Sequence, residues 1–165
     1  MPILRTSYLI PFLGLLACST GEDAVTDAPS SLHGLPGLEF TAETLVMESF
    51  PVQLRTIVTA RNKTGEAVTI SHGDPCIVML RVYDNEARSG EPVWDQERVN
   101  FCVAMVFDDE IAAFDTAVYQ TGADGYDILG DSLPDGRYWL SAHVTLSQGN
   151  TEVPAGVADL AVPRD

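Results

Sequence analysis

Basic residues are scarce in this sequence, in which 9 Lys and Arg stand against 24 Asp and Glu, for a formal net charge of −15. Proteins bind DNA and RNA by neutralising phosphates with Lys and Arg, so this balance excludes nucleic acid as a partner. An anionic lipid surface would repel the chain as well. Attachment to a membrane would therefore have to come from something other than a charged protein face.

The sequence also lacks a long, uninterrupted apolar run of the kind that forms a transmembrane helix. The run Tyr8–Ala17 is about half of the ~20 residues that a span needs, and Pro11 and Gly14 interrupt it. It follows Arg5 and ends in small residues, which is typical of a cleavable secretory signal. We therefore expect export, and we leave residues 1–17 out of the folded domain.

The signal ends in Leu15-Leu16-Ala17-Cys18, which resembles the lipobox of bacterial lipoproteins. The resemblance implies that Cys18 becomes the first mature residue, with a diacylglycerol on its thiol and usually a third acyl chain on its amine. Two or more acyl chains anchor a protein stably. Ser19, in place of an Asp that would resemble an inner-membrane retention signal, favours the outer membrane. An ordinary signal peptide followed by a chance cysteine is the alternative.

The anchor would be followed by a polar tether and one domain. Residues 18–37 are rich in Ser, Thr, Gly, Asp and Ala, a composition too polar to bury a core. Residues 38–165 are enough for a single domain with one hydrophobic core. With lipid on Cys18, the partners expected are the membrane and a protein of the cell envelope.

Two cysteines remain for this exported domain, Cys76 and Cys102. A disulfide between them is the default in an oxidising compartment. In the chain-entropy model it would contribute roughly 3 kcal/mol. A metal site or a reactive thiol is the alternative, but neither residue lies in a Cys-x-x-Cys pair.

Alternating and β-branched segments, separated by turn residues about every ten positions, predict an all-β fold. Residues 38–47 are expected to form a first strand. Residues 52–61 alternate, and we expect them to pair with 67–71 in a hairpin around the turn 62–66. Residues 77–84 and 92–94 are expected to form a second hairpin.

The second half of the chain continues the β pattern. Residues 99–107 are apolar enough to cross the core as a strand, with Cys102 facing Cys76 and the acidic residues 108–110 ending it. Further strands are expected at 117–121, 126–129, 138–146 and 157–162, and one helical turn at 110–114. Together they predict an immunoglobulin-like antiparallel β-sandwich of seven to eight strands.

Three features, in this order, resemble the bacterial intracellular proteinase inhibitor family. They are the strand, Asn-led turn and strand of Val58–Ile70, the stretch Ile77–Tyr83 followed by a polar loop and Val93-Trp94, and Leu133-Pro134-Asp135-Gly136-Arg137-Tyr138. The last is a turn in which Pro fixes φ, Gly permits the reversal and Tyr begins a strand. The resemblance implies an immunoglobulin-like domain and a role as a proteinase inhibitor.

No catalytic residues are predicted. A nucleophilic enzyme would need a Ser or Cys beside a His and an acid, yet His33 lies in the tether and His143 lies in a strand pattern. His72 and Asp74, beside Cys76, form the better candidate pair because a loop can expose both. Glycine loops that cradle phosphates are absent, so no cofactor is expected.

Metal and binding residues are likewise not assigned. The acidic stretches 108–110 and 124–127 offer oxygen ligands for Ca²⁺ but lack the EF-hand pattern, which favours solvated turns and no metal. Trp94 and Trp139 are candidate anchors for a protein partner. Because Tyr138 and Trp139 are adjacent on a strand, one of the two is expected in the core.

These observations predict a non-enzymatic binding or accessory module of the cell envelope, with an unknown ligand and no cofactor. The alternative is an envelope proteinase inhibitor of the intracellular proteinase inhibitor type, which would use the loop 84–92 or the segment 106–114. A loop held in one conformation lowers the cost of binding a protease.

Overall fold

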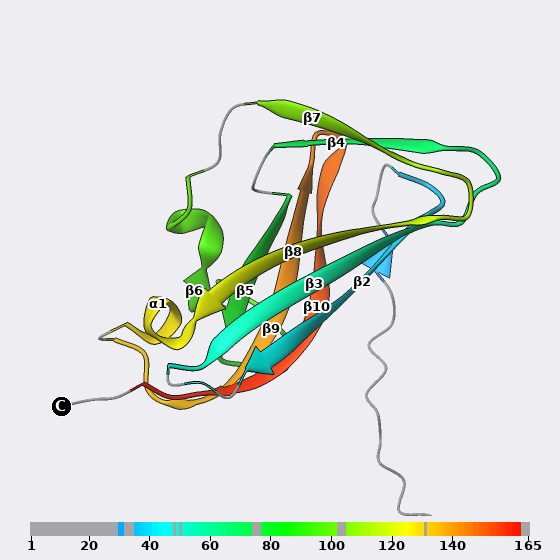
Figure 1. Ribbon diagram of the computed structural model, residues 1–165. Helices are drawn as coiled ribbons and strands as arrows, with labels where there is room; N and C mark the ends of the chain where they lie inside the picture. Colours follow the sequence, from blue (N-terminus) through cyan, green and yellow to red (C-terminus); the bar gives the residue numbers. More distant parts are fainter. Residues whose placement is uncertain are drawn as a thin grey trace, which may run out of the picture.

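The computed structural model describes residues 35–47, 49, 51–73, 77–101, 105–130 and 132–162, together with the strand Ser30–Ser31. Two four-stranded sheets lie face to face, and a two-stranded ribbon lies at one end (Figure 1). All pairings are antiparallel, which confirms the predicted all-β sandwich.

The first sheet has the strand order β1 (Ser30–Ser31), β2 (Leu38–Met47), β3 (Gln53–Asn62) and β8 (Thr116–Asp124). The second has the order β10 (Gly149–Leu160), β9 (Gly136–Leu146), β5 (Val78–Tyr83) and β6 (Trp94–Asp95). The ribbon consists of β4 (Val68–Gly73) and β7 (Val106–Ile111). The 3₁₀ turn η1 (Gln96–Arg98) and the helix α1 (Gly125–Leu129) complete the described elements.

Strand β3 shows how the alternating pattern builds the core. Leu54, Val58 and Ala60 are buried, whereas Arg55 and Arg61, on the opposite face of the strand, are exposed. Successive side chains of a strand point to opposite faces, so one face of β3 packs inward. Facing it from the other sheet are buried residues of β5 and β9, namely Val78, Leu80, Val82, Leu140, Ala142 and Val144.

The predicted hairpin of β3 with residues 67–71 is wrong. β3 pairs with β2 and β8, and β4 pairs with β7 instead. The buried side chain of Asn62 explains the corner, because its amide donates to the carbonyls of Glu66, Ile111 and Ala112. These bonds satisfy the carbonyls of two chain reversals at once, so β4 leaves the first sheet rather than folding back on β3.

The predicted hairpin of residues 77–84 and 92–94 is confirmed in shorter form. β5 pairs with β6 through Arg81 opposite Asp95 and Val82 opposite Trp94. The polar loop between the two strands closes on Asn85, whose side chain accepts from Ser89 N and donates to Ser89 O.

The described residues of the segment 99–107 do not form the predicted strand across the core, because residues 99–101 and 105 belong to no strand. The chain coils after η1, because the carbonyl of Gln96 accepts from both Val99 N and Asn100 N. Val99 and Phe101 are exposed, and β7 begins only at Val106, as the partner of β4. The acidic residues 108–110 lie within β7 rather than in a loop after it, so no helical turn begins at residue 110.

The predicted strand at residues 126–129 is also wrong, because these residues form α1. The side chain of Asp124 accepts from Asp127 N at 2.9 Å, which caps the first turn. Ile128 and Leu129 are buried beneath it. A local hydrogen bond from one carboxylate thus outweighs the β-like composition of the segment. No helix among the described residues is long and apolar enough to span a membrane.

Candidate functional site

The sequence-predicted sites at Cys18, Cys76 and Cys102 lie outside the described residues, as do His33 and Asp74. The lipid anchor and the disulfide therefore stay predictions. The described surface carries two polar clusters, one around Arg81 on the second sheet and one around Asp109 on the β4–β7 ribbon.

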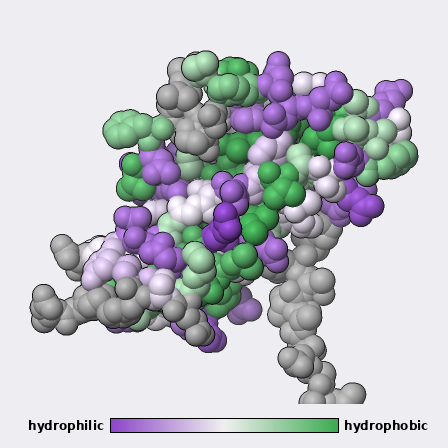
Figure 2. Space-filling view, viewed as in Figure 1, coloured by the Kyte–Doolittle hydropathy of each residue, from purple (hydrophilic) through white to green (hydrophobic). Residues whose placement is uncertain are grey.

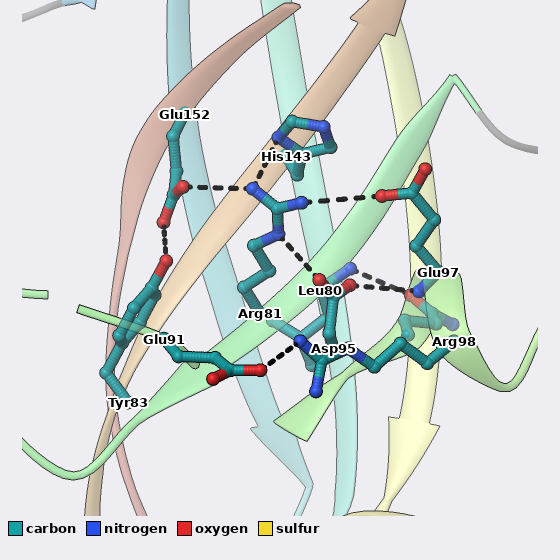
Figure 3. Close-up of polar contacts among 10 residues, drawn as sticks. Leu80, Arg81, Tyr83, Glu91, Asp95, Glu97, Arg98, His143 and Glu152 are labelled. Atoms are coloured by element: carbon teal, nitrogen blue, oxygen red, sulfur yellow. Dashed lines mark hydrogen bonds and ion pairs between the residues drawn. The ribbon is translucent and has the colours of Figure 1, made fainter. Parts of the chain in front are cut away.

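Arg81 lies on the outer face of β5, where its guanidinium meets three carboxylates (Figure 3). Its Nε donates to Asp95 Oδ2 at 3.0 Å, its Nη1 to Glu152 Oε2 at 3.3 Å, and its Nη2 lies 3.4 Å from Glu97 Oε2. The Asp95 and Glu152 carboxylates raise the pKa of Arg81 further, against the effect of burial. These contacts join β5 to β6, η1 and β10.

His143, on the neighbouring strand β9, completes this cluster (Figure 3). Arg81 Nη1 donates to His143 Nδ1 at 3.0 Å, so Nδ1 is the acceptor and the proton of the neutral ring is on Nε2. Burial and the adjacent Arg81 charge lower the pKa of His143. The ring therefore serves as a neutral acceptor, and its basic nitrogen is occupied.

Glu152 also binds Tyr83, whose hydroxyl donates to Glu152 Oε1 at 2.5 Å. Burial and this carboxylate raise the pKa of Tyr83, which keeps the phenol protonated. The Arg81 cluster is thus a closed network in which carboxylates, guanidinium, imidazole and phenol satisfy one another. Its geometry fixes β6 and η1 against the sheet.

Gln96, in η1, connects the two sheets. Its Oε1 accepts from Leu80 N on β5 and from Thr121 Oγ1 on β8, at 2.8 and 2.9 Å. Its Nε2 donates to Gly122 O at 2.9 Å. The side chain is buried, and all its polar atoms are hydrogen-bonded. The turn η1 therefore connects the Arg81 cluster to β8.

The second cluster centres on Asp109. Its Oδ2 lies 3.1 Å from His72 Nε2 and accepts from the Tyr119 hydroxyl at 2.9 Å. The His72 ring stacks on Phe107 and meets Tyr119 edge-on. Burial, with the Asp109 carboxylate, raises the pKa of Tyr119. His72 was predicted in an exposed loop with Asp74, but it is buried in β4 and paired with Asp109 instead.

The other sequence candidates have structural roles. Asp124 caps α1 rather than gathering calcium ligands, and Asp108 accepts from Ser71 Oγ. Among the described residues, no group of three or more His, Cys, Asp or Glu side chains is arranged to hold a metal. Tyr138 is buried and Trp139 half-buried, which confirms that one of the pair belongs to the core.

Sequence reasoning missed Arg81, Gln96 and Glu152. One signal was present, since Arg81 is the single charged residue of the otherwise apolar strand Val78–Tyr83. Its partners were not readable, because Glu152 is 71 positions away in sequence.

No family model matches the chain, and no curated protein matches it. It is similar to part of a β-glucosidase from Erythrobacter marinus at 16% identity, with 74% of this chain and 16% of that chain covered and a TM-score of 0.39. A β-glucosidase from Listeria innocua gives 14% identity, 75% and 17% coverage and a TM-score of 0.36. A Bordetella pertussis protein bearing the name ApaA gives 18% identity, 78% and 94% coverage and a TM-score of 0.36. This chain thus spans about a sixth of each β-glucosidase, and the overlaps are too loose to assign a family or an activity.

Proposed function

We propose that the protein is a lipid-anchored binding module of the bacterial cell envelope that acts without chemistry of its own. The tetrapeptide Leu15-Leu16-Ala17-Cys18 supports the anchor. Residues 18–37 would then hold the sandwich away from the membrane. The outer membrane is the expected location, and a protein is the expected partner.

The observation that carries the binding role is a set of four exposed apolar side chains among the described residues between η1 and the start of β7. Val99, Phe101, Met105 and Val106 are 57%, 95%, 61% and 68% exposed. Figure 2 shows apolar residues at the surface in this part of the molecule. Large apolar side chains gathered on the surface are typical of protein contacts, because covering them removes apolar area from water.

The anchor is tested by replacing Cys18 with Ala and following membrane association and intact mass. We expect the wild-type protein to pellet with membranes at the mass of a cleaved, acylated chain, and the variant to stay unprocessed and unacylated. An unchanged mass and membrane association in the variant would remove the lipoprotein mechanism.

The binding role is tested by capture from envelope extract with the mature protein in detergent, read by mass spectrometry beside a protease assay. The double change Val99→Ser and Phe101→Ser is expected to abolish capture of the partner. The matched control, Leu45→Ser and Met47→Ser, alters exposed apolar residues on β2 and is expected to retain capture. Failure of the wild-type protein to retain any partner would contradict the proposal, and a captured protease losing activity would favour the inhibitor role instead.

A further inference from the structure

Strand β8 lies at the edge of the first sheet, so one side of its backbone is paired with β3 and the other side is open. Gly125 N donates to Val52 O, and Asn62 N donates to Asp115 O, so the odd-numbered residues from 115 to 125 point their backbone groups toward β3. In an antiparallel strand the intervening residues point theirs to the other side. The even-numbered residues of β8 therefore direct N–H and C=O groups away from the sheet.

These outward groups are only partly used. Gly122 O accepts from Gln96, and Thr116 N donates to the side chain of Asp115. Within the described part of the chain, no group bonds the backbone of Val118 or Gln120 on this side. Val118 is 63% exposed, and Gln120 is exposed as well. The open edge thus runs from Thr116 to Gly122, where Gln96 closes it.

The sequence of β8 is unusual for an edge strand. Residues 116–123 carry no charge and no proline, and the pairing with β3 continues without a bulge. By contrast β10, an edge strand of the second sheet, has Pro154, a register shift at Gly156 and the charged residues Glu152 and Asp159. Charge, proline and bulges protect edges against added strands. β10 has this protection, and β8 lacks it.

Carboxylates outnumber basic groups around the open edge, where the exposed Arg55 and Arg61 of β3 lie opposite Gly122 and Thr116. Asp109 of β7 is bonded to Tyr119 of β8, which places the ribbon beside this strand, and its neighbours Asp108 and Glu110 are exposed. Asp115 and Asp124 lie at the two ends of the edge. Because the whole chain also has a net charge of −15, a second copy would be repelled, whereas a basic segment would be attracted.

We propose that the open edge of β8 docks an extended, basic peptide segment of a partner protein, which adds as one more strand beside Thr116–Gln120. This inference rests on the proposed binding function and names the kind of partner and its mode of binding. Main-chain bonds to Val118 and Gln120 supply the pairing, and alternate side chains of the peptide reach the acidic ribbon.

Hydrogen exchange tests the pairing residue by residue. In the free, full-length protein in detergent, the amides of Val118 and Gln120 are expected to exchange quickly, and those of Tyr119 and Thr121 slowly. The probe is a nine-residue peptide of alternating Val and Lys. Its binding is expected to slow exchange at Val118 and Gln120 by at least tenfold. Binding without this protection, or no binding at millimolar peptide, would overturn the proposal.

A proline substitution provides a second test of whether the peptide binds at this edge. Gln120→Pro removes an outward N–H and leaves the bonds to β3 intact, so we expect peptide affinity to fall at least tenfold in a folded protein. Gln120→Ala retains the N–H and is expected to bind within about twofold of wild type. Equal affinity of Gln120→Pro and Gln120→Ala would overturn the edge as the site.

Three further measurements test the charge of the peptide, a second copy as the occupant, and failure of the edge proposal separately from failure of the binding function. A matched Val and Glu peptide is expected to bind at least tenfold more weakly, and equal binding would overturn the basic partner. Sedimentation that shows a dimer broken by Gln120→Pro would assign the edge to a second copy, against the proposal. If envelope capture is lost in the Val99 and Phe101 variant but unaffected by Gln120→Pro, the edge proposal fails while the binding function stands.

Discussion

At the scale of single residues, buried polar side chains determine how the strands change direction. Asn62 is fully buried and donates to three carbonyls, while its Oδ1 accepts from Thr64 N and Oγ1 at 2.9 and 2.7 Å. A buried carbonyl left without a donor costs about 1–3 kcal/mol. One side chain therefore holds the two chain reversals that meet at the Val68–Ile111 end of the β4–β7 ribbon.

Asn62→Ala is expected to destabilise the protein by about 2–4 kcal/mol, because it leaves the buried carbonyl of Ile111 and its neighbours without donors. The midpoint and slope of urea unfolding measure this change. Asn85→Ala, which removes comparable bonds in an exposed loop, is the matched control and is expected to cost less than half as much. Equal losses for the two variants would contradict the role of Asn62.

His143 gives the stability a defined dependence on pH. Its folded pKa is lowered by burial and by Arg81, although Glu97, Glu152 and Asp95 act in the opposite direction. The unfolded chain therefore binds a proton near its usual pKa of about 6.5, where the folded protein does not. The contribution of His143 to stability is complete above this pH and is lost as the pH falls toward the folded pKa.

We expect the free energy of unfolding to decline below about pH 6.5 more steeply in the wild-type protein than in His143→Gln. Denaturant unfolding at a series of pH values measures both slopes. Parallel slopes in the two proteins would show that His143 does not titrate on unfolding.

At the scale of elements, alternation along the chain was enough to locate most strands. Residues 38–47 form β2 as predicted, and β3, β8 and β9 follow their expected patterns within a few residues. Pairing was harder to predict, because it depends on contacts between distant residues. The corner between β3 and β4 depends on the bond from Asn62 to the carbonyl of Ile111, and α1 depends on the cap by Asp124. The periodicity of apolar residues reveals neither interaction.

Proline substitutions at adjacent positions of β8 distinguish its two sides. The N–H of Thr121 faces β3, where Thr121 pairs with Thr56, so Thr121→Pro removes a ladder bond and is expected to cost at least about 1 kcal/mol more than Gln120→Pro. The N–H of Gln120 faces outward, so Gln120→Pro is expected to leave the free energy of unfolding nearly unchanged, because proline is tolerated at an edge. Thermal unfolding of both variants measures the contrast, and similar costs would reverse the assigned sides of the strand.

At the scale of the whole molecule, the edge strand β10 is protected and the edge strand β8 is open, and apolar side chains are exposed beyond η1. The candidate anchor and disulfide were predicted from the sequence, whereas the Arg81 cluster and the open edge required the three-dimensional arrangement. Cys76 and Cys102 lie outside the described residues. Their disulfide stays a prediction, for which the mass under non-reducing conditions is the check.

The central claim is that an anchored domain binds an envelope protein at the edge of β8. Photo-cross-linking in cells, with the reactive residue at position 118 or, as control, at the exposed position 137 of β9, tests it most directly. From position 118 we predict a cross-linked product, found in the membrane fraction, with one protein that carries a basic segment. From position 137 we predict no cross-linked product. No adduct from position 118, or equal labelling from both positions, would contradict the account.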